Sequence, residues 1–242
     1  MKLLGIETSS PSFSVAVSEG PKILTTLQGE GQGRPSSLLT DLIQQSLEKA
    51  GLKLPELDGF AISIGPGSFT GLRVGVMTVK TLAWALKKPV LPISSLEVLA
   101  HGAGGVNSAP NIHLFLDARK GNVYWAHFRR NGEELQRMSP DELLRPEEAL
   151  GRIKPPVLMV GDGLRRYAEV IASLKLLSRE VPRSGASSSP SGFEQSPASL
   201  WIPRADLLCR IAHSRWPAGI VDDPHPLVPQ YLYSMESDIT GR

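Results

Sequence analysis

The order of short apolar strands and helices repeats in the two halves of this sequence, and this order limits the possible folds. Residues 2–27 predict three strands joined by short turns, because Ser12–Ser18 alternates polar and apolar side chains and Glu19-Gly20-Pro21 is a turn. Residues 111–129 begin the same way, with two strands around a tight connection. Each half therefore predicts an antiparallel meander at the start of a mixed sheet.

Helices and further strands follow each meander. Gly51 ends a helix, Ser68 is a plausible N-cap for a helix that reaches about Lys88, and Ser94 with Glu97 has the spacing of a capping box. The other expected elements are strands at 59–64, 89–93 and 157–160, helices near 142–153, 164–174 and 204–214, and an extended end at 230–233. The pattern predicts an α/β fold of two RNase H-like lobes with mixed sheets flanked by helices.

The expected lobes are residues 1–102 and 103–242, with a boundary in the Gly/Pro-containing stretch 102–110. Residues 184–199 are rich in Ser, Pro and Gly, which predicts a mobile loop inside the second lobe. The tail is a candidate to return to the first lobe.

Charge, cysteine content and hydropathy exclude several classes of protein. The 242 residues carry 26 Lys+Arg against 24 Asp+Glu, a net charge of +2, so the chain does not bind nucleic acid by bulk charge. The single cysteine, Cys209, cannot form an internal disulfide and fits a reducing compartment. No stretch reaches the roughly 18 uncharged apolar residues of a membrane span. We expect a soluble, cytoplasmic protein that does not contact membranes.

The glycine-rich segment Ser63–Gly75 lies between a predicted strand and a predicted helix. Free backbone amides at a helix N-terminus suit an anion, but the segment matches neither the P-loop nor the G-x-G-x-x-G fingerprint. Two interpretations remain: the glycines allow tight turning and close packing, or they form an anion or nucleotide site. The candidate contacts of such a site are Glu7, Thr8, Gly65, Gly67 and Ser68.

Other residue patterns give weak support for catalysis or metal binding. Glu7 at a strand end can orient a metal-bound nucleotide, or can accept N–H bonds in the Thr8–Ser10 turn. Asp117 can take part in catalysis, or can accept hydrogen bonds from the backbone of its own turn, the role that Asp usually has there. Successive histidines are 12, 14, 86 and 12 residues apart, so no pair lies one helical turn apart and we expect no metal site. Ser68 is in no nucleophile elbow, and Cys209 fits an apolar helix face, so protease chemistry has no support.

The run IGPGSFTGLRVG at residues 64–75 resembles the signature of the TsaB family, also called YeaZ. Three further segments resemble that family: LLGIETSSPSFSVAV at the start, LDARKGNVYWAHF in the second half, and PLVPQYL near the end. The resemblance implies a two-lobed ASKHA (actin-like ATPase) fold and a role in synthesis of threonylcarbamoyladenosine next to the anticodon of tRNA. It also implies a heterodimer with the catalytic TsaD subunit, with which the ATPase TsaE associates.

The helix from Ser68 to about Lys88 is apolar on two sides. On a helical wheel, Leu72, Val76 and Val79 fall on the side expected to cover the sheet, together with Ala83 and Leu86. The opposite side can pack on the preceding helix or on a partner, and the resemblance, which implies a helix bundle with TsaD, favours the partner. The expected interface residues are Leu39, Ile43, Gly71, Val74, Met77, Thr78, Thr81, Trp84 and Ala85.

The sequence and the resemblance together predict a non-catalytic subunit that binds and activates a TsaD-like transferase. The alternative is a free-standing ASKHA-type ATPase or kinase that uses Glu7 and the Gly65–Gly71 turn. We expect no tightly bound cofactor, with ATP or ADP at the interface of the complex as a candidate. We expect tRNA to bind through the complex. Direct contact at Arg129-Arg130, beside Tyr124, Trp125 and Phe128, is a further candidate, but the pattern favours a core role for these aromatic residues. The chain alone is a candidate homodimer.

Overall fold

A computed structural model describes residues 1–30, 35–103, 109–173, 192–216 and 223–233 of the chain. It divides into two compact units. Unit 1 comprises Met1–Val98 and Pro203–Gln230, and unit 2 comprises Leu99–Ile202 and Tyr231–Arg242. Among the described residues, no helix is both long and apolar enough to cross a bilayer.

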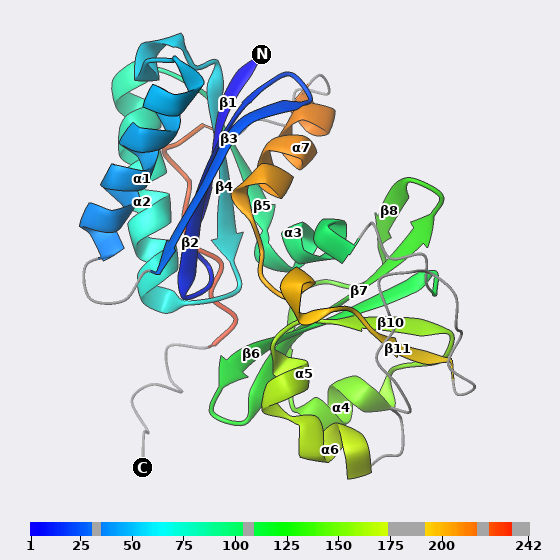
Figure 1. The fold of residues 1–242 in the computed structure, drawn as a ribbon. Helices are drawn as coiled ribbons and strands as arrows, with labels where there is room; N and C mark the ends of the chain where they lie inside the picture. Colours follow the sequence, from blue (N-terminus) through cyan, green and yellow to red (C-terminus); the bar gives the residue numbers. More distant parts are fainter. Residues whose placement is uncertain (31–34, 104–108, 174–191, 217–222, 234–242) are drawn as a thin grey trace. The chain divides into compact units, whose positions relative to one another are not determined.

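Unit 1 contains a mixed five-stranded sheet in the order β3-β2-β1-β4-β5 (Figure 1). The first three strands pair antiparallel, as the meander predicts, and β4 and β5 add in parallel. The strands are β1 (Lys2–Glu7), β2 (Ser12–Glu19), β3 (Lys22–Glu30), β4 (Gly59–Gly65) and β5 (Val90–Ser94).

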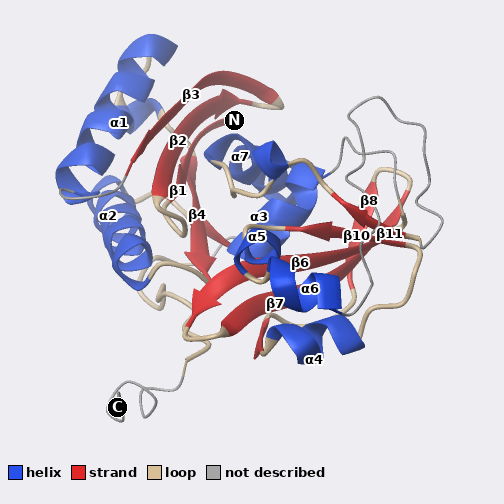
Figure 2. Cartoon of the chain, turned by 60° about the horizontal axis from the view of Figure 1, so that its bottom comes forward, coloured by secondary structure: helices blue, strands red, loops and turns tan. Residues whose placement is uncertain are grey.

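Helices cover both faces of this sheet, which is why β1 is apolar without alternation (Figure 2). Leu4 and Ile6 face a core shared with α1 (Pro35–Ala50) and α2 (Phe69–Leu86). Leu3 faces a second core shared with α7 (Ala205–Arg215). Unit 1 also contains the 3-10 turn at Leu54–Glu56, and α3 (Ser95–Gly102) follows β5.

Unit 2 repeats the same strand order, β8-β7-β6-β10-β11, with the same antiparallel and parallel senses. Its short helices pack on one another and on β6 and β7. The strands are β6 (Asn111–Arg119), β7 (Asn122–Asn131), β8 (Glu134–Arg137), β9 (Glu142–Leu144), which pairs with β7, β10 (Val157–Val160) and β11 (Phe193–Gln195). The helices are α4 (Pro146–Gly151), α5 (Gly163–Arg166), α6 (Ala168–Ser173) and the 3-10 turn Ala198–Leu200. The predicted α/β class, with two mixed sheets flanked by helices that share one strand order, is confirmed.

Several expected elements differ in detail. The helix expected over 142–153 is β9 followed by α4, because Pro146 begins a helix rather than interrupting one. Part of the loop expected over 184–199 has regular structure: β11 pairs in parallel with β10, and the Trp201 indole donates to the Ser196 carbonyl (3.0 Å). Residues 184–191 lie outside the described part of the chain.

The division into units differs from the expected lobes at two segments. Residues 99–102 belong to unit 2, and part of the tail, the candidate to return to the first lobe, belongs to unit 1. Residues 203–230, expected in the second lobe, belong to unit 1. In α7, the Ala205 amide donates to the Ser14 hydroxyl (2.9 Å), and Cys209 packs where a Cβ on Gly5 would clash. Leu227 is buried in the α1/α2 core. The sheet of unit 1 therefore needs this distant segment to cover it.

Candidate functional site

The glycine-rich turn between β4 and α2 is formed as the sequence predicts. Ser68 is the N-cap of α2, and its hydroxyl accepts a hydrogen bond from the Gly71 amide (3.3 Å). The Ser68 amide donates to the carbonyl oxygen of Ser9 (2.7 Å), which lies in the turn after β1. Two of the amides that an anion would use are therefore bonded within the chain.

The glycines of this segment are required by close packing against the turn after β1. A Cβ on Gly67 would overlap the Ser9 carbonyl, and a Cβ on Gly71 would overlap the Thr8 carbonyl. A Cβ on Gly75, one helical turn further, would overlap the Thr8 hydroxyl. The backbone of Thr8 and Ser9 fills the space in front of the helix N-terminus. This geometry favours the packing interpretation of the motif over the anion site.

Glu7 is fully buried and accepts a hydrogen bond from the Ser9 amide (2.6 Å). The structure thus gives it the N–H acceptor role among the two interpretations. Burial raises the pKa of the Glu7 carboxyl, and its Oε2 has no hydrogen-bond partner. Gly65, the remaining candidate contact, adopts a φ of +115° and lies against the Gln230 carbonyl. The five candidate contacts lie near one another, but Glu7 and Thr8 present no side chain to solvent.

The helix α2 has one buried side and one exposed apolar side. Leu72, Val76 and Val79 are buried against the sheet, as the wheel predicts. On the other side Met77 is 59% exposed and Trp84 is 66% exposed. We call Val74, Met77, Thr81, Trp84 and Ala85 the outer face of α2; Thr81 and Ala85 are exposed and Val74 is half-buried.

The other expected interface residues lie deeper. Leu39 is 0% exposed and Gly71 is buried against Thr8, so both belong to the core of unit 1 and neither presents a side chain to a partner. Ile43 and Thr78 line a groove of about 430 Å³ between α1 and α2. Sequence periodicity could not separate these positions, because a helix packed beside another helix buries residues on two sides.

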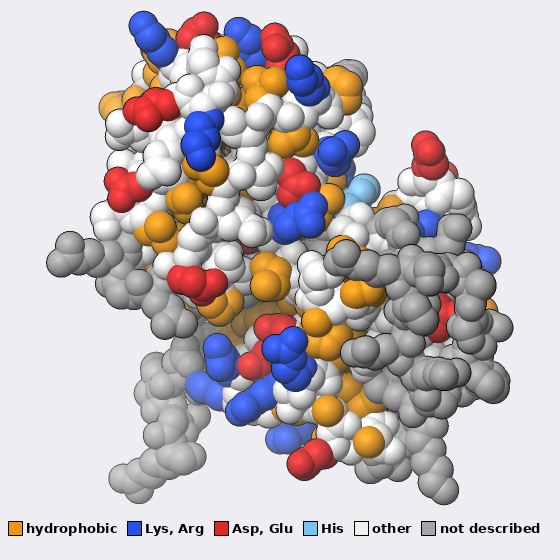
Figure 3. All heavy atoms as spheres, in the orientation of Figure 1, with side chains coloured by type: hydrophobic (Ala, Val, Ile, Leu, Met, Phe, Trp, Pro, Cys, Tyr) orange, Lys and Arg blue, Asp and Glu red, His pale blue; other side chains and the backbone are white. Residues whose placement is uncertain are grey.

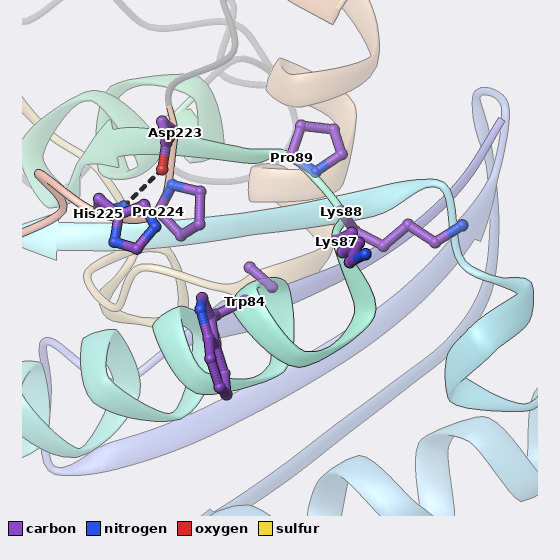
Figure 4. Close-up of a pocket in the computed structure, with 8 residues that line it drawn as sticks. Trp84, Lys87, Lys88, Pro89, Asp223, Pro224 and His225 are labelled. Carbon is purple, nitrogen blue, oxygen red and sulfur yellow. Dashed lines mark hydrogen bonds between the residues drawn. The ribbon is translucent and has the colours of Figure 1, made fainter.

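A second hollow, of about 420 Å³, lies at the C-terminal end of α2 (Figure 4). Trp84, Lys87 and Lys88 line it from the helix end, and Asp223–His225 line it from the C-terminal segment. The Lys80 ammonium holds that segment by donating to the His225 carbonyl (2.8 Å). The hollow thus continues the outer face of α2 toward the C-terminal segment.

In unit 2, the aromatic residues weighed for tRNA contact, Arg130 and Asp117 have structural roles, whereas Arg129 is exposed. Tyr124, Trp125 and Phe128 are buried, and Arg130 donates to the Ala103 carbonyl (3.4 Å), so this segment offers no exposed aromatic surface. Asp117 accepts from the Arg119 amide (3.0 Å), the turn role weighed for it.

Two histidines that are distant in the sequence are neighbours in the structure. His113 on β6 lies opposite His127 on β7, with the rings stacked 4.2 Å apart, and burial lowers the pKa of His113 to about 3. The predicted hairpin could have revealed this pair, because its two-residue turn fixes the register. Among the described residues no three His, Cys, Asp or Glu side chains are grouped so as to hold a metal ion.

Comparisons with known proteins agree with this fold and these motifs. The family described as "TsaD: tRNA N6-adenosine threonylcarbamoyltransferase" matches residues 34–189. The tRNA threonylcarbamoyladenosine biosynthesis protein TsaB of Haemophilus influenzae is 31% identical over 179 residues, 70% of this chain and 75% of that protein. TsaB of Bacillus subtilis is 27% identical over 241 residues, 98% of this chain and 96% of that protein.

A solved structure extends the likeness to three dimensions. YeaZ from Pseudomonas aeruginosa matches with a TM-score of 0.77 and 28% identity, over 96% of this chain and 99% of that chain. Because that match covers 96% of the chain, it spans both units. The glycine-rich turn lies within residues 34–189, which the family match covers. The chain therefore belongs to the TsaB (YeaZ) family.

Proposed function

We propose that this chain acts in the biosynthesis of tRNA threonylcarbamoyladenosine as a non-catalytic subunit that pairs with a TsaD-like transferase. The names of its relatives support the pathway. The outer face of α2 supports the role of a paired subunit, since a chain that works alone would not need large apolar side chains exposed there. In the proposed complex TsaD performs the transfer, a TsaE-like ATPase joins the pair, and tRNA binds to the whole assembly.

The outer face of α2 is the proposed partner surface. A helix on the surface of a monomer is normally polar on its outer side, yet here Met77 and Trp84 are both more than half exposed. Burying a large apolar side chain contributes on the order of 1.5–3 kcal/mol. The groove between α1 and α2 beside Thr78 gives a partner helix a place to insert side chains.

The buried state of Glu7 and the filled glycine-rich turn support a non-catalytic role. A nucleotide-dependent enzyme of this fold needs a carboxylate and amides that face its ligand. Here Glu7 bonds to its own turn, and Gly67 and Gly71 abut the chain's own backbone. These contacts disfavour the free-standing ATPase or kinase. We propose that ATP or ADP binds only where the partner completes a site.

Pairing is tested by mixing the chain with the TsaD-like protein of its own host and measuring the mass of the complex by light scattering. Met77→Arg and Trp84→Arg should each weaken pairing at least 100-fold, because the partner would bury an unpaired charge. The isolated variants should keep the wild-type melting temperature, since both side chains are largely exposed. Val74 is a poorer choice because it also packs on the core.

Met138→Arg is the matched control, since Met138 is also an exposed methionine but lies in unit 2. It should pair like the wild type. If the chain forms a homodimer instead, the same two variants should abolish it. Wild-type pairing by both Met77→Arg and Trp84→Arg would place the interface elsewhere, and tight Mg-dependent ATP turnover by the chain alone would favour the enzyme.

A further inference from the structure

The turn between β6 and β7 holds two cationic residues in an unfavourable backbone conformation. Arg119 and Lys120 have φ values of 64° and 49°, and Gly121 follows at 77°. Two-residue hairpin loops of this kind favour Asn-Gly or Gly-Gly, because side chains with a Cβ are disfavoured at positive φ. Such strain persists only where surrounding contacts maintain it, and it is frequent at functional sites.

Hydrogen bonds from neighbouring side chains maintain this turn. The Asp117 carboxylate accepts from the Arg119 amide (3.0 Å), and the Asn122 amide group donates to the Lys120 carbonyl (3.3 Å). The Tyr233 hydroxyl donates to the Arg119 carbonyl (3.1 Å). These three side chains fix the backbone of the turn. The side chains of Arg119 and Lys120 themselves are exposed, that of Arg119 by 76%.

A second cationic pair is held beside this turn by α5. Tyr167, which follows α5, donates from its hydroxyl to the Asp117 carboxylate (3.3 Å) and the Asn122 carbonyl (3.1 Å). Asp162, which precedes α5, accepts from the Asp117 amide (2.9 Å). Arg165 and Arg166 at the end of α5 are exposed. We call Arg119, Lys120, Arg165 and Arg166 the basic cluster; Figure 3 shows Lys and Arg side chains gathered over these elements.

The two carboxylates beside the cluster, Asp117 and Asp162, accept hydrogen bonds from backbone amides and from a tyrosine hydroxyl. Asp117 also lies 3.7 Å from the Arg119 guanidinium. Among the described residues, these contacts bring two carboxylates to four cations, and Lys120 and Arg165 also lie over the rings of Tyr233 (5.8 Å) and Trp201 (5.5 Å). No comparable exposed group forms at Arg129-Arg130, because Arg130 is half-buried.

We propose that the basic cluster binds the sugar–phosphate backbone of RNA, and that in the complex it contacts the tRNA substrate. The inference rests on the proposed function. Four cations on a fixed turn and an adjacent helix suit phosphates, for which Arg provides paired donors and Lys a point charge. The aromatic side chains of β7 are buried, so the contact positions the RNA without reading its bases.

The test measures binding of a fluorescently labelled, unmodified tRNA transcript to the full-length chain in complex with the TsaD-like subunit. Anisotropy titrations at 50–200 mM salt compare the wild type with Lys120→Gln/Arg165→Gln/Arg166→Gln. The variant should bind about 10-fold to 100-fold more weakly at the lowest salt, and the slope of log affinity against log salt should fall by about 1 for each lost phosphate contact. Lys22→Gln/Lys154→Gln, at two exposed lysines outside both the basic cluster and the outer face of α2, is the control and should bind like the wild type.

Light scattering of the same samples separates this inference from the proposed function. Unchanged tRNA affinity of the triple variant overturns the inference. Loss of pairing by that variant also overturns it, because the cluster would then be a protein contact. If the wild-type chain does not pair with the TsaD-like subunit, the proposed function fails, and the same titrations on the chain alone decide whether the cluster binds RNA.

Discussion

At the scale of single residues, the glycine motif shows what a sequence can and cannot establish. The spacing correctly predicts a strand, a turn and an N-capped helix, because these depend on local chemistry. It cannot tell whether the glycines make room for a ligand or for the chain itself. That depends on the turn after β1, about 60 residues earlier in the sequence, where Thr8 and Ser9 lie against Gly67 and Gly71.

Gly71→Ala tests this packing. Alanine is the better helix former by about 1 kcal/mol, but its Cβ would overlap the Thr8 carbonyl, so we expect a net loss of roughly 1–3 kcal/mol in the free energy of unfolding. Thermal denaturation followed by circular dichroism measures the loss. Gly151→Ala is the control, because a Cβ at Gly151 would have no neighbouring atom within 4 Å, and it should be neutral. Equal stability of Gly71→Ala and the wild type would contradict the packing interpretation.

The buried carboxyl of Glu7 should make stability depend on pH. Burial raises its pKa in the folded state above the ordinary value of 4.5, so the unfolded chain releases the proton first as the pH rises. The folded state therefore loses stability above about pH 4.5, by about 1.4 kcal/mol for each unit between the two pKa values, until the folded pKa is passed.

Glu7→Gln should remove this dependence and stabilise the protein at neutral pH, because the amide keeps an oxygen for the Ser9 amide and carries no charge. Urea denaturation at pH 5 to 8 gives the comparison. Glu19→Gln, at an exposed strand end, should follow the wild type. A pH profile of Glu7→Gln that parallels the wild type would show that Glu7 is not the source.

At the scale of elements, amino-acid composition gave a wrong prediction for a strand that forms only through pairing with a distant strand. The Ser/Pro/Gly content of residues 184–199 predicts a loop, yet Phe193-Glu194-Gln195 completes the unit 2 sheet as β11. Three residues carry too little periodicity to be recognised as a strand. The long helix α2 was predictable because it has five turns of pattern and a cap. The helical wheel located the buried side of α2. It could not show that Leu39 of the neighbouring helix α1 lies in the core.

Replacing Phe193-Glu194-Gln195 with Gly-Ser-Gly should lower the melting temperature by several degrees. The change weakens the pairing with β10 and removes a half-buried Phe, and 1 kcal/mol corresponds to about 2–4 °C for a chain of this size. Replacing residues 184–191 with an equal length of Gly/Ser should leave it within about 2 °C, because their composition lacks large apolar side chains. Differential scanning calorimetry measures the melting temperature of both variants. Equal melting temperatures would mean that β11 contributes nothing to stability.

At the scale of the whole chain, the sequence correctly indicates two similar halves but not their membership. The repeat of strand order is visible because each half starts with a meander. The sequence makes the tail a candidate to return to the first lobe but cannot show that residues 203–230 belong to unit 1, since α7 is an ordinary amphipathic helix that could cover either sheet. Its place is specified by distant residues: Gly5 and Ala16 leave space for Cys209, and the Ser14 hydroxyl accepts from the Ala205 amide.

A fragment of residues 1–102 should therefore not fold by itself, although the sequence alone delimits it as a lobe. It lacks α7, so Leu3, Leu91 and Ile93 would be exposed on one face of the sheet. It also lacks Leu227, which belongs to the core on the other face.

Joining residues 1–102 to 203–233 through a Gly/Ser linker restores the cover of both faces of the sheet. This linked fragment should unfold cooperatively in urea, while residues 1–102 alone should show no transition. The linked fragment with Leu227→Ala should lose roughly 2–5 kcal/mol. A cooperative transition of residues 1–102 alone would mean that the meander and its two long helices are enough for a stable fold, and that unit 1 does not need the C-terminal segment to fold.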